Sequence, residues 1–354
     1  MKSLRPRVEI QALRAYRVRQ DAEVKLNQNE SPLDWPDEMK AHVLARVAAR
    51  PWNRYPSRDA AAVRAAFARG AGISPEMVAV TNGSNEAILA LVEAFATARS
   101  VVLTAPGYSM STPLALIGGA RPTPVPLRGD FSLDVPAMLG AAEATDAALI
   151  FLASPNNPTG NAFSRQDIAR VLEASRALVV VDEAYAQFAE DSFLPDLTPY
   201  PHLVVLRTCS KAFALAGARI GLIAAREEVI AAISKALPPY NVNVFAQEAA
   251  LAALARPDAV AERVRLIILE RERLAEAMAA LHGVTVYPSQ TNFLLFRTPL
   301  AADILFERLL RQGVLVRDVS HQPLLERCLR VTVGTAQDNA RFIHALKASL
   351  ASGR

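Results

Sequence analysis

Six short, almost wholly apolar runs alternate with helix-like stretches between Ile73 and Ala225. Amphipathic segments such as Glu86–Thr97 and Ser164–Ala174 lie between them, and Ser164 is a suitable helix N-cap. Short apolar strands joined by helices predict a mostly parallel sheet that is covered by helices on both faces. The apolar runs are Met77–Thr81, Val101–Thr104, Ala147–Leu152, Leu178–Val181, Leu203–Leu206 and Ile220–Ala224.

The sequence pattern changes after Pro238 and Pro239. A long helix-rich stretch, Ala246–Leu281, is interrupted near Pro257, and strand-like and helix-like segments then alternate as far as a last helix from Gln337. This mixture predicts a smaller α+β domain. We therefore expect a large domain over residues 45–245 and a small C-terminal domain over residues 246–354, with residues 1–44 packing on the small domain and over the active site. The segments after Ala246–Leu281 are Val284–Tyr287, Phe293–Phe296, Ala302–Gln312, Val314–Val316 and Leu329–Val333.

Composition and charge disfavour several classes of protein. The cysteines, Cys209 and Cys328, and the five scattered histidines lack metal-ligand spacing, so we expect no metal. The formal charge of +4 comes without the basic run that is typical of nucleic-acid binding. No apolar signal-peptide core follows Met1, and there is no run of roughly 18 apolar residues such as a membrane span needs. We expect a cytoplasmic protein.

Reactive side chains follow the predicted strands, which is where ligands bind in open α/β sheets. The strand Leu203–Leu206 leads into the string RTCSKAFALAGARIG, where Lys211 can form a Schiff base with an aldehyde cofactor. Thr208 and Ser210 supply hydroxyl groups, and Arg219 supplies a guanidinium suited to a phosphate. A solvated loop lysine is the ordinary alternative, and the surrounding hydroxyls and the Gly-x-Arg-x-Gly string disfavour it.

Two further strand ends carry polar groups. The strand Ala147–Leu152 leads into the rigid turn SPNNPTG, from which Asn157 can direct its amide at a ligand oxygen. After the strand Leu178–Val181, Asp182 can pair with a protonated pyridine nitrogen and Tyr185 can hydrogen-bond a ring oxygen. Binding of Mg²⁺ by Asp182, as in phosphate-binding ATPases, would need a Gly-Lys-Ser/Thr loop, and the sequence has none.

The first predicted strand runs into a helix through Gly83, Ser84 and Asn85. Free backbone N–H groups at a helix N-terminus bind anions, so a phosphate fits here. An ordinary serine N-cap is the alternative interpretation. Tyr108 follows the next strand and can stack on a planar ring, although a packed loop aromatic has the same appearance in a sequence.

These strings resemble a known family. SPNNPTG, VDEAY and TCSKAFALAGARIG occur in the order found in fold-type I aminotransferases, which use pyridoxal 5'-phosphate (PLP), and they most resemble the histidinol-phosphate aminotransferases. The resemblance runs from LNQNESP at Leu26–Pro32 and NRYPS at Asn53–Ser57 to LVRDVS at Leu315–Ser320 and LRVTVGT at Leu329–Thr335. It implies an α/β fold: a large PLP-binding domain with a mostly parallel seven-stranded sheet between helices, plus a smaller α+β domain.

The resemblance also implies a role for each matched residue. Lys211 would form the Schiff base with PLP and then move the proton between the substrate α-carbon and the cofactor. Asp182 would pair with the pyridine nitrogen, Asn157 and Tyr185 would hydrogen-bond the phenolic oxygen, and Tyr108 would stack on the ring. The residues implied to hold the cofactor phosphate are Ser84, Asn85, Thr208, Ser210 and Arg219, with Gly83 beside them.

Other matched residues concern the substrate and the assembly. Arg330 matches the residue that holds the anionic end of the substrate, and Arg317 matches a second phosphate contact, although a surface ion pair is the alternative for Arg317. Two guanidiniums suit a phosphate dianion better than a carboxylate. Tyr16 and Asn29 match the segment that covers the substrate. Tyr55 matches a residue that reaches the cofactor phosphate of the neighbouring subunit, which implies a homodimer with shared sites.

The implied reaction is a ping-pong transamination. L-glutamate gives up its amino group and leaves as 2-oxoglutarate, and imidazole-acetol phosphate becomes L-histidinol phosphate, a step of histidine biosynthesis. Lys211 must be neutral to act as a base, so we expect burial and Arg219 to lower its pKa.

Several alternative functions remain. Within the fold these are an aromatic amino-acid aminotransferase and a threonine-phosphate decarboxylase. Asn85, where many relatives have Asp, and the N-terminal string ALRAYR, which lacks the usual Pro-Tyr or Pro-Gly, depart from the common pattern and bear on substrate choice. A nicotinamide dehydrogenase would need a GxGxxG after the first strand, which is absent. A non-catalytic PLP-binding protein is disfavoured by Lys211, Asp182 and Arg330.

Overall fold

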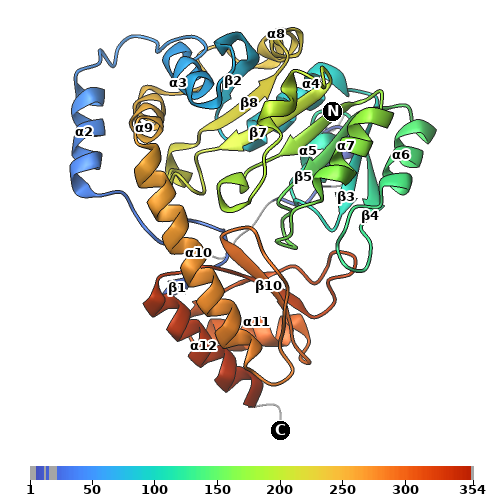
Figure 1. Cartoon of the computed structure of the whole chain (residues 1–354), viewed down its shortest axis with the longest axis vertical. Helices are drawn as coiled ribbons and strands as arrows, with labels where there is room; N and C mark the ends of the chain where they lie inside the picture. Colours follow the sequence, from blue (N-terminus) through green and yellow to red (C-terminus); the bar gives the residue numbers. More distant parts are fainter. Residues whose placement is uncertain (1–4, 12, 16–21, 352–354) are drawn as a thin grey trace.

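The computed structural model describes residues 5–11, 13–15 and 22–351, so Tyr16 lies outside the described residues. Its largest element is a seven-stranded sheet with the order β2-β8-β7-β6-β5-β3-β4 (Figure 1). β8 runs antiparallel to β2 and β7, and all other neighbouring strands are parallel. The predicted α/β fold with a mostly parallel sheet is therefore confirmed. The strands are β2 (Val78–Thr81), β3 (Ser100–Ala105), β4 (Arg121–Pro126), β5 (Ala147–Ala153), β6 (Leu178–Asp182), β7 (Leu203–Thr208) and β8 (Gly221–Ala225).

Six of these strands coincide with the apolar runs of the sequence, and the edge strand β4 does not. Its sequence RPTPVP contains three prolines, and only Val125 is buried. Proline cannot donate a backbone hydrogen bond, so within a sheet it is confined mainly to edge strands. β4 pairs with β3 alone, which makes the prolines tolerable. β5 is buried along its whole length, which explains why it appears as a continuous apolar run.

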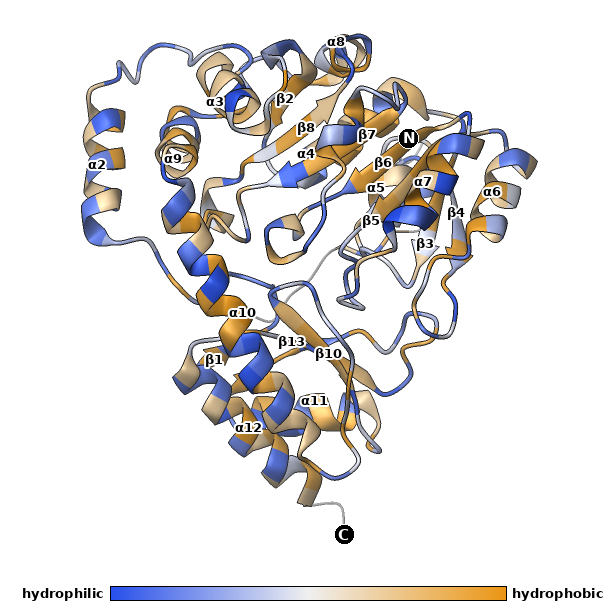
Figure 2. Cartoon of the chain, viewed as in Figure 1, coloured by the Kyte–Doolittle hydropathy of each residue, from blue (hydrophilic) through white to orange (hydrophobic). Residues whose placement is uncertain are grey.

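Helices cover both faces of this sheet, and alternate residues of a strand face different helices. Ile150 of β5 belongs to the hydrophobic cluster that includes Met138 and Ile168, from α6 and α7. Its neighbour Leu149 belongs to the cluster that includes Leu91 and Ile233, from α4 and α8. Figure 2 shows the resulting apolar strands between helices of mixed hydropathy. These helices are α3 (Ala61–Ala71), α4 (Ser84–Phe95), α5 (Ser111–Ile117), α6 (Val135–Ala144), α7 (Arg165–Ala174) and α8 (Glu227–Ala236).

The helix-rich stretch that follows contains α9 (Val244–Leu254) and α10 (Pro257–Ala279), with Pro257 in the first turn of α10. Figure 1 shows α10 extending from the large sheet to a smaller, four-stranded sheet with the order β12-β13-β10-β9. Helices α11 and α12 pack there, and Phe296, Leu305 and Phe342 are among the buried residues of its core. The remaining elements are β9 (Thr285–Val286), β10 (Phe293–Arg297), α11 (Ala302–Arg311), β11 (Val314–Leu315), β12 (Arg317–Asp318), β13 (Cys328–Thr332) and α12 (Ala336–Ala351).

The N-terminal segment contacts both parts of the chain. β1 (Val24–Lys25) pairs with β11, whereas α1 (Val8–Gln11) contacts α5. α2 (Asp37–Ala48) packs on α9, which itself packs on α3 beside the large sheet. Arg46 of α2 hydrogen-bonds the buried Glu248 of α9 at 2.6 Å. Among the described residues, no helix is both long enough and apolar enough to cross a membrane.

Candidate active site

The carboxyl ends of neighbouring strands surround a cavity of about 610 Å³. β6 and β7 contribute their last residues, the loop after β7 contributes Lys211, and the smaller sheet closes the opposite side with β12 and β13. Parallel strands end at the same edge of a sheet, so residues far apart in the sequence meet here. The predicted site residues that line the cavity are Asn29, Ser84, Asn85, Tyr108, Asn157, Asp182, Tyr185, Thr208, Ser210, Lys211, Arg219, Arg317 and Arg330.

Lys211 points its amine into this cavity. Nζ donates a hydrogen bond to the backbone oxygen of Gln28 at 3.0 Å and lies 5.9 Å from the centre of the Tyr185 ring. Desolvation lowers the pKa of Lys211 to about 7, with help from the positive charges of Arg330 and Arg219. The expected direction of this shift is therefore found, and of the two arginines Arg330 has the larger effect. Near neutral pH a large fraction of the amine is unprotonated and can act as a base or a nucleophile.

Asp182, the last residue of β6, is 5% exposed and lines the same cavity. Its Oδ1 accepts a hydrogen bond from the backbone N–H of Ala184 at 3.1 Å. Desolvation raises the pKa of Asp182 to about 7 against the opposing effect of that hydrogen bond. A buried carboxylate in this state favours a cationic partner, because a nearby positive charge compensates for the lost hydration.

Polar side chains from different elements are joined beside Lys211. Asn29 Nδ2 donates to the Tyr185 hydroxyl at 2.8 Å, and Arg330 Nη1 donates to Asn157 Oδ1 at 2.6 Å. Arg330 also donates to the backbone oxygen of Asn27 at 2.6 Å. These contacts tie the N-terminal segment, the turn after β5 and β13 into one rigid wall.

The start of α4 forms an anion cradle with Arg219. Gly83 is the N-cap residue with φ 82°, and Ser84 is the first helical residue, two positions earlier than the expected Glu86. A Cβ on Gly83 would lie 2.4 Å from Arg219 Nη2, so only glycine allows the guanidinium so close to the helix N-terminus. Gly83 itself supports the cradle and is not among the lining residues. Arg219 adopts a left-handed backbone with φ 59°, a strained conformation of the kind that clusters at ligand sites.

Two hydroxyls of the cradle come from the last residue of β7 and from the loop that follows it. Thr208 Oγ1 donates to Ser210 Oγ at 3.0 Å, and both residues are buried. Across the cavity, the Tyr108 hydroxyl donates to Asn85 Oδ1 at 2.9 Å, which fixes the ring of Tyr108 beside the start of α4. The alternative interpretation of the start of α4, a serine N-cap, is wrong, because the N-cap residue of α4 is Gly83.

One predicted site residue, Tyr55, lies elsewhere. Tyr55 is 82% exposed on the segment between α2 and α3, where its ring stacks on Tyr240 with centroids 4.6 Å apart. It is absent from the cavity lining of this chain. Tyr16 falls outside the described residues.

Part of the N-terminal wall was not predicted from the sequence. Asn27, Gln28 and Glu30 line the cavity beside Asn29. Residues Val24 and Lys25 pair with β11, and this pairing carries the following residues across the cavity. The string LNQNESP marks the segment in the sequence, but it does not reveal a strand of two residues.

This set of side chains fits pyridoxal phosphate. Lys211, with its lowered pKa, suits the aldehyde of PLP, and the buried carboxylate of Asp182 suits the pyridine nitrogen. The anion cradle of hydroxyls, N–H groups and a guanidinium suits the phosphate. In the described part of the chain, no three His, Cys, Asp or Glu side chains are grouped so that they could hold a metal ion.

Comparisons with known proteins agree with this chemistry. Residues 21–346 match the family described as aminotransferase class I and II. A histidinol-phosphate aminotransferase of Chlorobaculum tepidum is 40% identical over 342 residues, which cover 96% of this chain and 98% of that protein.

Solved structures show the same architecture. The histidinol-phosphate aminotransferase of Sinorhizobium meliloti in complex with pyridoxal-5'-phosphate has a TM-score of 0.89 at 26% identity, with 99% of each chain covered. An L-threonine-O-3-phosphate decarboxylase of Porphyromonas gingivalis has a TM-score of 0.81 at 26% identity, with 93% of this chain and 99% of that chain covered.

Proposed function

The chain belongs to the class I and II aminotransferases, and from that premise we propose that it is a PLP-dependent histidinol-phosphate transaminase. It transfers the amino group of L-glutamate to imidazole-acetol phosphate, giving L-histidinol phosphate and 2-oxoglutarate, a step of histidine biosynthesis. The names of its relatives support this substrate pair. The cavity supplies the residues that such a reaction needs.

The main observation in favour of a phosphorylated substrate is a pair of arginines. Arg317 of β12 lies directly opposite Arg330 of β13 in the antiparallel register, and both line the cavity. Like charges directly opposite each other on a sheet are destabilising unless an anion lies between them. A phosphate dianion accepts hydrogen bonds from two guanidiniums at once, whereas one arginine is sufficient for a carboxylate.

Lys211 is the residue that we assign to proton transfer. When bound, PLP supplies an electron-withdrawing ring that stabilises negative charge on the substrate α-carbon. Once its amine is free, Lys211 would take the proton from that carbon and pass it to the cofactor. A pKa of about 7 suits both directions of transfer, because neither protonation state then dominates.

The other site residues are assigned to orienting the cofactor ring and holding its phosphate. Asp182 would keep a proton on the ring nitrogen, which would maintain the electron-withdrawing character of the ring. Asn157 and Tyr185 would hydrogen-bond the phenolic oxygen, and Tyr108 would stack on the ring. Ser84, Asn85, Thr208, Ser210 and Arg219, all of which line the cavity, would hold the phosphate.

The assembly that we propose is a homodimer with shared sites. Tyr55 and Trp52 are 82% and 76% exposed on the same segment, and large aromatic side chains so exposed are suited to burial in an interface. In the dimer Tyr55 reaches the cofactor phosphate of the neighbouring subunit, and Tyr16 and Asn29 cover the substrate. A cytoplasmic location also stays a prediction.

The likeness to a threonine-phosphate decarboxylase makes that activity the second candidate. Its substrate also carries a phosphate, so the two arginines do not separate the two enzymes. They do argue against an aromatic amino-acid aminotransferase, whose substrates have no phosphate.

The deciding measurement is the visible absorption spectrum of the PLP-loaded protein during titration with L-histidinol phosphate, without any keto acid. Loss of the cofactor band at low concentration, with far weaker responses to O-phosphothreonine and phenylalanine, supports the proposal. A response to O-phosphothreonine with release of CO₂ would favour the decarboxylase.

The variant Lys211→Ala tests the assigned base. It should abolish multiple-turnover transamination, because both the covalent anchor and the proton carrier are lost. Substantial residual turnover in Lys211→Ala, measured with a coupled 2-oxoglutarate assay, would contradict the role of this residue.

A further inference from the structure

A buried ion pair lies directly behind the cofactor-facing residues. Glu183 follows Asp182, so its side chain points to the opposite side of the strand end. Glu183 Oε2 lies 2.7 Å from Arg207 Nη2, and the two side chains are 2% and 11% exposed. In the register of β6 and β7, Asp182 is opposite Leu206, so Glu183 and Arg207 are the next residues along each strand. The pair therefore links the two strand ends that carry Asp182 and lead to Lys211.

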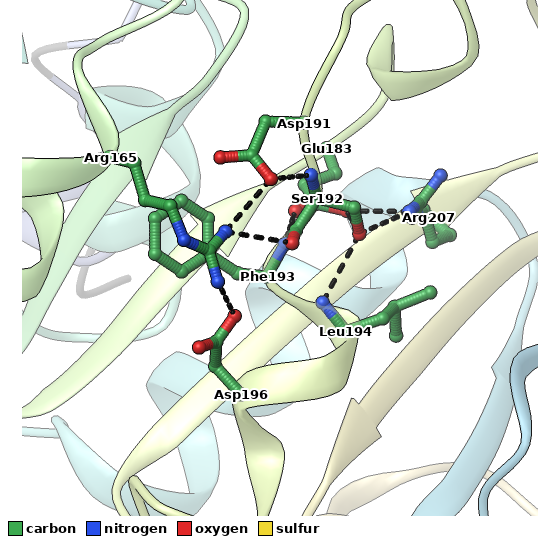
Figure 3. Close-up of polar contacts among 8 residues, drawn as sticks. All are labelled: Arg165, Glu183, Asp191, Ser192, Phe193, Leu194, Asp196 and Arg207. Carbon is green, nitrogen blue, oxygen red and sulfur yellow. Dashed lines mark hydrogen bonds and ion pairs between the residues drawn. The ribbon is translucent and has the colours of Figure 1, made fainter.

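A loop adds hydrogen bonds to both members of this pair, as Figure 3 shows. The Ser192 hydroxyl donates to Glu183 Oε2 at 2.9 Å and accepts from Arg207 Nη2 at 2.8 Å. The backbone N–H of Phe193 donates to the other carboxylate oxygen of Glu183. Both oxygens of Glu183 are thus bonded, which is the arrangement that offsets the cost of burying a charge.

The same loop is fastened from outside by Arg165, near the start of α7. Its guanidinium donates to Asp191 Oδ1 at 2.8 Å and to the backbone oxygen of Ser192 at 3.2 Å, and it pairs with Asp196 (Figure 3). It also lies over the Phe193 ring, 4.8 Å from the centroid. The loop therefore holds Ser192 in place, instead of leaving its hydroxyl to solvent.

We propose that the Glu183–Arg207 pair, held by Ser192, is a positioning element for the proposed transamination. It fixes the end of β6 against the end of β7, so that Asp182 and the Thr208–Lys211 loop keep a constant spacing around the cofactor. It also cancels two charges that would otherwise act on that cofactor. This inference rests on the proposed PLP chemistry and adds residues that do not themselves line the cavity.

The pair acts on the site through Asp182: the charge of Glu183 raises the pKa of Asp182, and Asp182 in turn acts on Lys211. Arg207, Asp191 and Asp182 act on Glu183, while Arg330, Arg219, Glu30 and Asp182 act on Lys211. Removing the charge of Glu183 leaves Arg207 buried and positive, because a guanidinium does not lose its proton. An added positive charge near the site disfavours a proton on the Lys211 nitrogen.

The test is the pH midpoint of the cofactor absorption band in PLP-loaded Glu183→Gln. We expect this midpoint to fall by about half a pH unit or more relative to the wild type, together with a lower kcat. In the double variant Glu183→Gln/Arg207→Met both charges are absent, so the midpoint should return towards the wild-type value while kcat stays low. A purely structural role would lower the thermal midpoint of the cofactor-free protein in both variants and leave the spectral midpoint unchanged, which would overturn the proposal.

Arg265→Gln is the matched control, because it breaks the exposed pair with Glu262 on α10 and should change neither midpoint nor kcat. If Glu183→Gln does not fold, Ser192→Ala keeps both charges and removes only the bridging hydroxyl. It should lower kcat severalfold at an unchanged spectral midpoint, and a wild-type kcat would overturn the proposal. The spectral readout needs only bound PLP, so a wild type with no response to histidinol phosphate would refute the substrate and leave this test intact.

Discussion

At the scale of single residues, Asp182 ties the stability of the protein to pH. Its pKa is raised from 3.8 to about 7 by desolvation, so the folded, cofactor-free protein holds a proton between these values that the unfolded chain has lost. The free energy of unfolding therefore decreases as the pH rises from about 4 to 7, by up to about 4 kcal/mol. Asp182→Asn cannot ionise and should escape this loss. Calorimetry without PLP should show that the melting temperature of Asp182→Asn minus that of the wild type increases from pH 5 to pH 7.5. A constant difference would mean that Asp182 keeps an ordinary pKa.

The sequence revealed the types of site residue but not their mutual influence. Lys211, Asp182 and Asn157 follow strands, and their positions could be predicted because parallel strand ends meet at one edge. From the sequence, Arg219 was the charge expected to lower the pKa of Lys211, together with burial. Arg330 has the larger effect, because Asn157 and the backbone of Asn27 direct its guanidinium into the cavity. Such contacts depend on tertiary packing and leave no local pattern in the sequence.

At the scale of elements, the register of β12 and β13 sets the proposed substrate preference. Arg317→Gln keeps a polar, though shorter, side chain and removes one of the two facing guanidiniums. We expect kcat/KM for L-histidinol phosphate to fall roughly tenfold or more, the value of one charged hydrogen bond. The cofactor half-reaction with an amine that lacks a phosphate should change little. Equal losses for both amines, measured by stopped-flow absorption, would show that Arg317 acts on the fold and not on the phosphate.

Strands that are buried along their whole length could be predicted from the sequence. Elements whose position depends on proline, glycine or a distant pairing partner could not. β5 is an apolar run because both faces are covered, whereas β4 contains prolines that only its edge position tolerates. α4 begins at Ser84 because Gly83 adopts a positive φ and acts as the N-cap. β1 is two residues long and forms only against β11, so no local pattern could predict it.

At the scale of the whole molecule, the site described for one chain lacks Tyr55. Tyr55 is exposed, stacks on Tyr240 and does not line the cavity of its own chain. The proposed dimer would bring it to the cofactor of the partner subunit. The N-terminal segment likewise joins both parts of the chain, through the pairing of β1 with β11 and the packing of α2 on α9. α2 leads directly into the segment that carries Tyr55, so its attachment to α9 places the aromatic residues of the proposed interface.

Shared sites make a prediction about mixtures of two defective variants. Lys211→Ala lacks the proton carrier, and Tyr55→Ala lacks the phosphate contact that the other subunit needs. In a heterodimer of the two, one site contains both substitutions and the other contains neither. After unfolding and refolding an equal mixture with PLP, half of the dimers are heterodimers, so about a quarter of all sites should regain wild-type kcat. Each variant refolded alone is the control. Activity in the mixture no greater than the mean of the two controls would mean that each site is complete within one chain, and that the exposed position of Tyr55 serves another purpose.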